Sequence, residues 1–283
     1  MNNIKSDYLN IKSDYLNIKN DRLLYSVKGE GEPLILIHGN FNDSRVWDYQ
    51  VEYFADYYKV IYYDQRGYGK SDTPTSVFSH YEDLKALFDQ LGIRKANIIG
   101  SSLGGSVAVD FALQYPQLVN KLILVAPSIN GCRYPLRVVL EGMKNIFFLK
   151  SKGFEAAIEK FIGNPFWEYF FPSENRQEAR EKVLETVKTQ KNFYSWDFKL
   201  AMPHKPLANK RLQEIHVPVL IVISDKDKAF NIKVCEYVCK NIKNSKKIVM
   251  SDCGHLPFVE KPQEFNRYVL DFLSFSVQNP SWD

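Results

Sequence analysis

Residues 97–112 read NIIGSSLGGSVAVDFA, and this stretch decides the fold. Its beginning is a short apolar run typical of a buried strand, and its end has the small and apolar residues of a buried helix. Between them lies the pentapeptide Gly100-Ser101-Ser102-Leu103-Gly104, a G-x-S-x-G pattern. The pattern alone occurs readily by chance, but the strand–turn–helix context is what a sharp turn with an exposed central serine requires. We therefore predict that Ser102 is a nucleophile.

The two glycines of the pentapeptide have a steric role. The chain must reverse tightly between strand and helix, so the central residue takes an unusual backbone conformation. Gly100 and Gly104 stand two residues before and two after it, and their small size avoids a clash across the turn. Ser102 is then exposed above the sheet, at the positive end of the helix. Ser101 is only the turn residue that precedes it.

Outward from this stretch, apolar runs alternate with amphipathic segments. The runs are continuous, as expected for strands buried on both faces of a parallel sheet. They are Pro33–Ile37, Val60–Tyr63, Ala96–Ile99, Lys121–Val125, Val217–Ile223 and Lys247–Met250. The amphipathic segments predict helices over about residues 79–91, 103–115, 231–242 and 262–275. The alternation predicts an α/β fold with a mostly parallel, eight-stranded type of sheet flanked by helices.

The interval 128–212 breaks this alternation. It has no strand-like run, but it has several helical patterns and the aromatic segment Pro165–Pro172. We expect a helical cap here, inserted into a core that residues 21–127 and 213–283 form together. Such a cap would cover the carboxyl edge of the sheet, where open α/β sheets bind their ligands.

A tandem repeat of seven residues begins the chain. Residues 3–9 and 10–16 are identical, and residues 17–23 are a degenerate third copy. The Ile and Leu of each unit are too far apart for the a and d positions of a coiled coil, so we favour a duplicated strand segment. We expect residues 1–20 to be an N-terminal extension, weakly attached at least in its first copy.

Composition argues against several kinds of partner. The chain has 283 residues, and its 37 basic and 33 acidic side chains are interleaved, which does not indicate nucleic acid. It has neither a run near the roughly 20 apolar residues of a membrane span nor the apolar core of a signal peptide. We expect a cytoplasmic protein without membrane association. The four cysteines include no CxxC pair and predict neither disulfides nor a metal site.

An unassisted serine is a weak nucleophile, so Ser102 needs a base. The chain has five histidines, of which His255 follows the last predicted strand, at the sheet edge where Ser102 stands. His80, His204 and His216 lie in polar or proline-flanked contexts and are expected to be structural.

The base in turn needs an acid that fixes its tautomer and stabilises its charged form. Two aspartates, Asp225 and Asp227, follow the predicted strand Val217–Ile223. Asp227 is the preferred acid, because the turn must pass the strand end before a side chain can reach His255. Asp225 is the alternative.

A tetrahedral intermediate needs hydrogen-bond donors for its oxyanion. The backbone N–H of Leu103, directly after the nucleophile, is one candidate. The other is the N–H of Asn40, in the loop His38–Phe41 that follows the first buried strand. Gly39 allows the backbone of this loop to approach a substrate, and His38 is expected to brace the loop rather than act as a base.

Four motifs in this order resemble the α/β-hydrolase fold superfamily over about residues 20–277. They are His38-Gly39, Asp64-Gln65-Arg66-Gly67-Tyr68-Gly69-Lys70-Ser71, Gly100–Gly104, and Gly254-His255 followed by Glu260-Lys261-Pro262. The resemblance implies the same fold and agrees with the chain order serine, aspartate, histidine. In that superfamily the second motif is a structural loop, so Asp64 and Arg66 receive no catalytic role.

Differences from the sequences of related enzymes argue against some activities. The loop His38–Asn40 is similar to that of haloalkane dehalogenases, and epoxide hydrolases share the fold. Both use an aspartate where this chain has Ser102, which argues against both activities. Many relatives carry a glycine at the position of Ser224 and a proline after the acid, and this chain has neither.

The sequence therefore predicts a serine hydrolase that cleaves a small, largely apolar carboxylic ester through an acyl-enzyme, without a metal or organic cofactor. Carbon–carbon, lactone or amide hydrolysis by the same residues is an alternative. A ligand receptor or signalling regulator of the same fold is an alternative of another class. A small-molecule substrate is the expected partner, and no protein partner is indicated. Candidate pocket residues, which would serve equally as a cap core, are Phe41, Phe166, Trp167 and Trp196.

Overall fold

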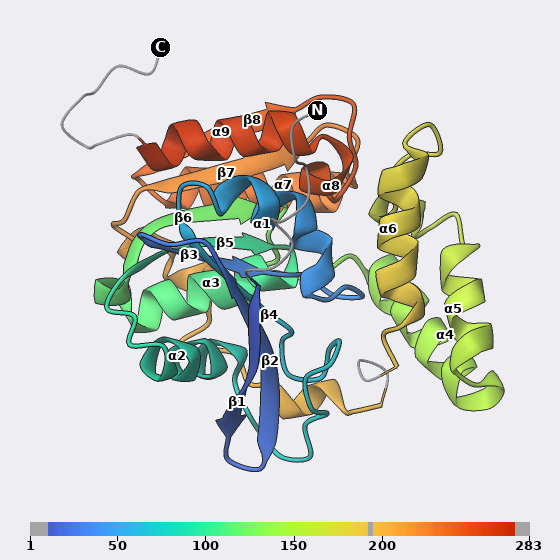
Figure 1. Ribbon diagram of the computed structural model, residues 1–283. Helices are drawn as coiled ribbons and strands as arrows, with labels where there is room; N and C mark the ends of the chain where they lie inside the picture. Colours follow the sequence, from blue (N-terminus) through green and yellow to red (C-terminus); the bar gives the residue numbers. More distant parts are fainter. Residues whose placement is uncertain (1–10, 192–194, 275–283) are drawn as a thin grey trace, which may run out of the picture.

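The computed structural model describes residues 11–191 and 195–274. Its centre is an eight-stranded sheet in the order β1-β2-β4-β3-β5-β6-β7-β8 (Figure 1). β2 pairs antiparallel with β1 and with β4, and the other neighbours pair parallel. The predicted α/β class with a mostly parallel sheet is confirmed. The strands are β1 Lys12–Ile18, β2 Asp21–Lys28, β3 Pro33–Ile37, β4 Lys59–Tyr63, β5 Ala96–Ser101, β6 Val119–Val125, β7 Val219–Ser224 and β8 Ser245–Met250.

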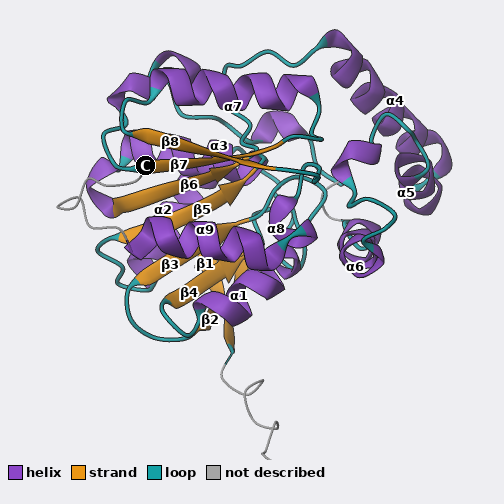
Figure 2. Ribbon diagram, turned by 90° about the horizontal axis from the view of Figure 1, so that it is seen from above, coloured by secondary structure: helices purple, strands orange, loops and turns teal. Residues whose placement is uncertain are grey.

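Helices cover both faces of the sheet (Figure 2). One apolar core lies under α2, α3 and α7, and a second lies under α1, α8 and α9. The four helices predicted from amphipathic segments are present as α2, α3, α7 and α9. The bounds are α1 Asp48–Phe54, α2 His80–Gln90, α3 Leu103–Gln114, α7 Ala229–Asn241, α8 Pro257–Glu260 and α9 Pro262–Ser274.

The burial of the strands explains their sequences. Every residue of β5 and β7 is buried, which is why both read as unbroken apolar runs. β8 is an edge strand, and its Lys246 and Lys247 are exposed. Charged side chains on an edge discourage the addition of a further strand.

The amino-terminal strand joins the sheet earlier than the sequence suggested. β1 pairs with β2 from Lys12 to Ile18, inside the stretch 1–20 expected to be an extension. Only Leu16 of this strand is buried, so β1 has little of the apolar pattern that marks the inner strands. Residues 1–10, with the whole first repeat copy, lie outside the described residues.

A helical insertion separates β6 from β7. It contains α4 (Leu136–Lys152), α5 (Phe154–Ile162) and α6 (Gln177–Lys188). Figures 1 and 2 both show these helices together at one end of the strands. They lie within the segment 128–212 for which a cap is predicted. The second core continues into them through buried side chains such as Phe161.

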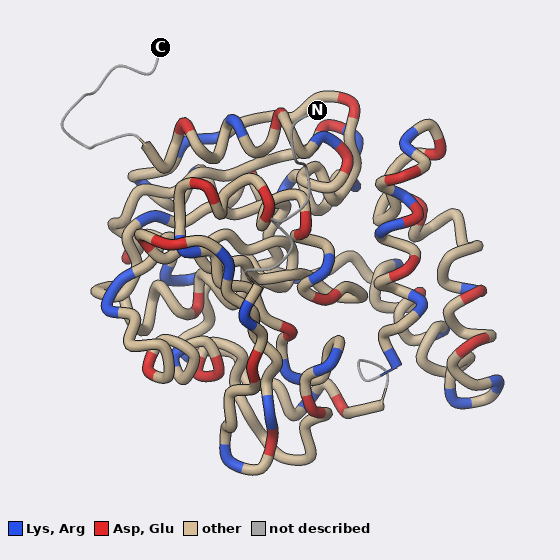
Figure 3. The backbone as a smooth tube through the Cα atoms, in the orientation of Figure 1, with Lys and Arg blue, Asp and Glu red and all other residues tan. Residues whose placement is uncertain are grey.

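Charge is distributed evenly over the chain. Figure 3 shows basic and acidic residues interleaved on both the sheet domain and the insertion. No helix among the described residues is long and apolar enough to cross a membrane.

Candidate active site

The turn between β5 and α3 is one residue long. β5 ends at Ser101 and α3 begins at Leu103, so Ser102 alone connects them. Its φ of 51° and ψ of −114° lie outside the usual regions for a residue with a side chain. Such a conformation costs about 1–3 kcal/mol and persists only where the surroundings enforce it. The predicted strand–turn–helix context of Ser102 is present.

Close backbone packing enforces this turn. A Cβ on Gly100 would overlap the carbonyl oxygen of Gly104, and one on Gly104 would overlap that of Ile37 at the end of β3. A Cβ on Gly39 would lie 3.0 Å from the Cβ and 3.7 Å from the Oγ of Ser102. The loop after β3 therefore runs directly against the candidate nucleophile.

A buried histidine–aspartate pair lies at the ends of the last two strands. His255 Nδ1 is 2.8 Å from Asp227 Oδ2, and the two side chains are only 5% and 2% exposed. The carboxylate can only accept, so Nδ1 carries the proton and Nε2 keeps its lone pair. Asp225, the alternative acid, is exposed. Of the two aspartates, Asp227 is the one that bonds to His255.

Asn231 holds the carboxylate in place, a residue that the sequence did not reveal. Its side-chain amide donates to Asp227 Oδ1 at 2.7 Å and lies 3.2 Å from His255 Nδ1. The backbone N–H of Lys228 donates to the same oxygen at 2.7 Å. Both oxygens of Asp227 are thus occupied. Asn231 lies in the first turn of α7, just after the loop that carries Asp227.

The insertion covers the histidine. The N–H of His255 donates to the carbonyl of Tyr169 at 3.1 Å. The rings of Tyr169 and Phe170 lie 5.8 and 5.9 Å from the imidazole. Two residues of the insertion therefore shield the imidazole of His255 from water. Their contact with His255 joins residues that are far apart in the chain, so no local sequence pattern predicts it.

His38 is fully engaged in the loop after β3. Its Nδ1 donates to the carbonyl of Gly39 at 2.8 Å, and its Nε2 accepts the N–H of Gln65 at 3.0 Å. Burial lowers the pKa of His38 and favours this neutral form. Neither ring nitrogen is free to take a proton from a substrate. The contacts are those of a brace.

The loop Asp64–Ser71 also makes hydrogen bonds that hold the loop after β3. Asp64 accepts the N–H of Ser44 at 2.9 Å and that of Lys70 at 2.8 Å. Tyr68 donates its hydroxyl to the side-chain oxygen of Asn40, which fixes that residue next to Gly39. The Asp64–Ser71 motif thus contributes to the site by holding the loop that carries Asn40.

Ser102 and His255 line one cavity of about 280 Å³. Phe41 and Trp167, two of the predicted pocket residues, line it too. Phe41 stacks on Phe161 at 4.6 Å between ring centroids, so these aromatics form both a pocket wall and the core of the insertion. The other lining residues are Asn40, Ser128, Tyr134, Val138, Val139, Gly142, Tyr169, Phe170, Phe230 and Asn231.

The remaining predicted pocket residues line neighbouring hollows. Trp196 lies with Leu103 in a cavity of about 350 Å³, which shares Asn40, Ser128 and Tyr134 with the first. Phe166 lines a groove on the other side. The structure thus brings Phe41 and Trp167 to the candidate nucleophile but separates Trp196 and Phe166 from it. No cluster of His, Cys, Asp or Glu suited to a metal ion occurs among the described residues.

Comparison with known proteins places this geometry in context. The model of the alpha/beta hydrolase fold family matches residues 32–262. A 2-hydroxy-6-oxo-6-phenylhexa-2,4-dienoate hydrolase of Comamonas testosteroni is 28% identical, over 88% of this chain and 90% of that protein. A 2-hydroxy-6-oxononadienedioate/2-hydroxy-6-oxononatrienedioate hydrolase of Burkholderia vietnamiensis is 31% identical, over 89% and 91%.

Solved structures are similar over nearly the whole chain. Est816, described as an N-acyl homoserine lactone degrading enzyme, has a TM-score of 0.73 and 25% identity, covering 92% of this chain and all (100%) of that one. A thermophilic esterase from Thermogutta terrifontis has a TM-score of 0.78 at 23% identity, covering 93% and 98%, which shows a common fold.

Proposed function

The chain belongs to the alpha/beta hydrolase fold family and is a hydrolase, and from this premise we propose that it cleaves a small carboxylic ester through an acyl-enzyme on Ser102. His255 is the general base and Asp227 its orienting acid in this proposal. One observation carries it: the strained Ser102 lines the same cavity as His255, which is bonded to the buried Asp227 at 2.8 Å. The predominantly apolar cavity wall favours a substrate with an apolar acyl or alcohol part.

The proposed reaction begins with a proton transfer. His255 Nε2 takes the hydroxyl proton as Ser102 Oγ attacks the ester carbonyl carbon. Asp227 stabilises the resulting imidazolium. The imidazolium then protonates the leaving oxygen as its bond to the carbonyl carbon breaks, which releases the alcohol and leaves an acyl-enzyme. His255 next activates a water molecule, whose attack releases the acid and restores Ser102.

We assign the oxyanion to two backbone donors, the N–H groups of Leu103 and Asn40. Leu103 is the first residue of α3, and the first N–H groups of a helix have no acceptor inside it. Gly39 brings the other loop close to Ser102, and Tyr68 holds the side chain of Asn40. Loss of one such donor costs about 2.7–4 kcal/mol of transition-state stabilisation in well-studied hydrolases.

Carbon–carbon hydrolysis is the second candidate. Two relatives at 28% and 31% identity carry names of hydrolases of dienoate substrates, and each match covers nearly nine-tenths of this chain. The same three residues would serve. The difference lies in the leaving group. In carbon–carbon hydrolysis a carbon atom receives the proton, whereas in ester hydrolysis the alcohol oxygen receives it.

A fluorophosphonate probe tests the nucleophile. We expect one adduct on Ser102, located by mass spectrometry, and none in Ser102→Ala. An adduct elsewhere, or none, would contradict the proposal. Steady-state rates on p-nitrophenyl esters and on 2-hydroxy-6-oxo-6-phenylhexa-2,4-dienoate then separate the two candidate reactions. Labelling without turnover of either substrate would favour a receptor or regulator.

A further inference from the structure

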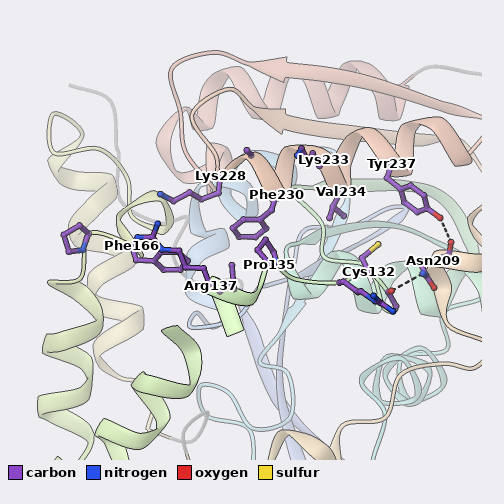
Figure 4. Close-up of a pocket in the computed structure, with 15 residues that line it drawn as sticks. Cys132, Pro135, Arg137, Phe166, Asn209, Lys228, Phe230, Lys233, Val234 and Tyr237 are labelled. Carbon is purple, nitrogen blue, oxygen red and sulfur yellow. Dashed lines mark hydrogen bonds between the residues drawn. The ribbon is translucent and has the colours of Figure 1, made fainter. Parts of the chain in front are cut away.

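A groove of about 920 Å³ lies between the start of the insertion and α7 (Figure 4). Val138 and Phe230 line both this groove and the cavity that contains Ser102, so the two hollows adjoin. The groove has aromatic walls, to which Phe166 and Phe230 contribute. It is therefore placed to hold the part of a substrate that extends beyond the reacting carbonyl.

The groove differs from the inner cavity in charge. Four cationic side chains line it, and no acidic residue does: Arg133, Arg137, Lys228 and Lys233. No lysine or arginine lines the cavity at Ser102. The molecule thus surrounds the reacting carbonyl with neutral groups and gathers positive charge next to it.

Two of these cations converge on one ring. The guanidinium carbon of Arg137, on α4, lies 5.2 Å from the centroid of Phe166. Lys228 Nζ, from the segment before α7, lies 5.8 Å from the same centroid. Figure 4 shows both side chains on the side of the groove where Phe166 lies. A cation–π contact contributes only about 0.5–1 kcal/mol at an exposed site, and it leaves two like charges close together.

None of these four charges is held in a salt bridge among the described residues. Within residues 11–191 and 195–274, none of the four cations forms an ion pair. The acid whose pKa responds to Arg137 is Glu141, which bonds instead to Lys144 at 2.8 Å and to Asn164 at 3.2 Å. An anion in the groove would therefore meet several cations and no lining carboxylate.

We propose that this groove binds an anionic group, a carboxylate or a phosphate, at the far end of the substrate whose carbonyl reaches Ser102. The inference rests on the proposed function and specifies its substrate class: a molecule that is apolar around the scissile bond and anionic beyond it. The groove cations Arg137, Lys228 and Lys233 hold the anion. Phe166 and Phe230 flank the chain that leads to it.

Matched esters test the inference. The mono-p-nitrophenyl ester of adipic acid carries a free carboxylate, and its methyl ester is the neutral counterpart. We expect the double variant Arg137→Gln/Lys233→Gln, which removes two groove cations and leaves Lys228 beside Asp227 in place, to raise KM for the anionic ester at least about fivefold, as expected for two exposed charge contacts. KM for the neutral ester and kcat for both should stay unchanged. Added salt should raise KM for the anionic ester in the wild type only.

Lys240→Gln is the matched control, since Lys240 is an exposed lysine of the same helix α7 that does not line the groove. It should leave both KM values unchanged. Equal KM values of the wild type for the two esters would overturn the inference, and probe labelling of Ser102 with neutral turnover would leave the proposed function standing.

Direct binding separates the two kinds of anion and needs no catalysis. Calorimetric titration of Ser102→Ala, which lacks the proposed nucleophile, with monomethyl adipate and with inorganic phosphate should give heat for at least one of them, and the double variant in the same Ser102→Ala background should lose it. If neither anion binds, or if the double variant binds them equally well, the groove is not an anion site. This conclusion holds even if Ser102 proves unreactive.

Discussion

Ser102 holds a conformation that a glycine would adopt without strain. Its φ of 51° brings its own Cβ toward the backbone, and the close approach of Gly100, Gly104 and Gly39 prevents relaxation. Strain of this kind is tolerated where it exposes a reactive group. It also makes the nucleophile a point where stability and activity oppose each other.

Replacement of Ser102 should show how much the strained backbone of this residue lowers the stability of the protein. We expect Ser102→Gly to melt at a higher temperature than Ser102→Ala, because alanine keeps the Cβ and glycine removes it. The difference should be about 1 kcal/mol, or roughly 2–4 °C for a chain of this size. Differential scanning calorimetry measures it. Equal melting temperatures would mean that the turn stores no strain.

The two aspartates after β7 should differ sharply in their effect on rate. Asp227→Asn should lower kcat by about 10⁴, because an amide favours the wrong tautomer of His255. Asp225→Asn should leave kcat unchanged, since its side chain is exposed. Ester hydrolysis by the two variants provides the measurement. A comparable loss of kcat in both variants would contradict the assignment of Asp227 as the acid that orients His255.

The residues with chemistry could be predicted because they follow strand ends. The candidates Ser102, Asp227 and His255 each come after a strand, and the carboxyl ends of parallel strands meet at one edge. Asn231 and Tyr169 could not be predicted, because their contacts with His255 join residues far apart in the sequence. Aromatic composition alone does not tell which ring of the insertion faces the cavity.

At the scale of elements, one arginine connects three parts of the sheet domain. Arg66 pairs with Asp83 at 2.6 Å and with Asp21 at 2.5 Å. Asp83 lies in α2 and Asp21 begins β2, while Arg66 itself belongs to the loop after β4. All three side chains are nearly inaccessible to solvent. The loop that braces Asn40 is thereby fixed to a strand and a helix.

Removal of this arginine should be costly. Arg66→Ala leaves two buried carboxylates without a partner, and we expect a loss of about 3–5 kcal/mol in the free energy of unfolding. Arg22→Ala is the control, because its pair with Asp72 is 3.2 Å long and exposed. That change should cost less than about 1 kcal/mol. Urea denaturation compares the two, and similar losses would contradict the role of burial.

The elements were predictable to different degrees for a physical reason. The inner strands and α2, α3, α7 and α9 follow the apolar periodicity that burial imposes. β1 buries one side chain and is held by backbone pairing with β2, which residue type does not report. Its inclusion in the sheet therefore needed the structure.

At the scale of the whole molecule, an aromatic cluster is one of the contacts that join the insertion to the sheet domain. Phe161, on α5, is fully buried and stacks on Phe41 of the loop that also carries Asn40. Trp167 lies 5.5 Å from Phe161, between ring centroids, and lines the cavity with Ser102. The shape of the site thus depends on packing between two parts of the chain.

Phe161→Ala should therefore affect both stability and rate. We expect a loss of about 3–5 kcal/mol from the cavity that it creates. We also expect a lower kcat/KM, because Phe41 and the adjacent Asn40 lose their support. Thermal melting and ester kinetics on one preparation measure the two effects. Unchanged kinetics in the destabilised variant would show that the cluster supports only the insertion.

The tandem repeat has a genetic consequence. Residues 5–11 read KSDYLNI, the same as β1 at Lys12–Ile18. Deletion of either identical unit, residues 3–9 or 10–16, produces one and the same shorter chain. That chain still supplies KSDYLNI directly before the turn into β2. A replication slip that removes one unit would thus be silent for the sheet, which makes this edge of the molecule tolerant of the length changes that repeated DNA invites.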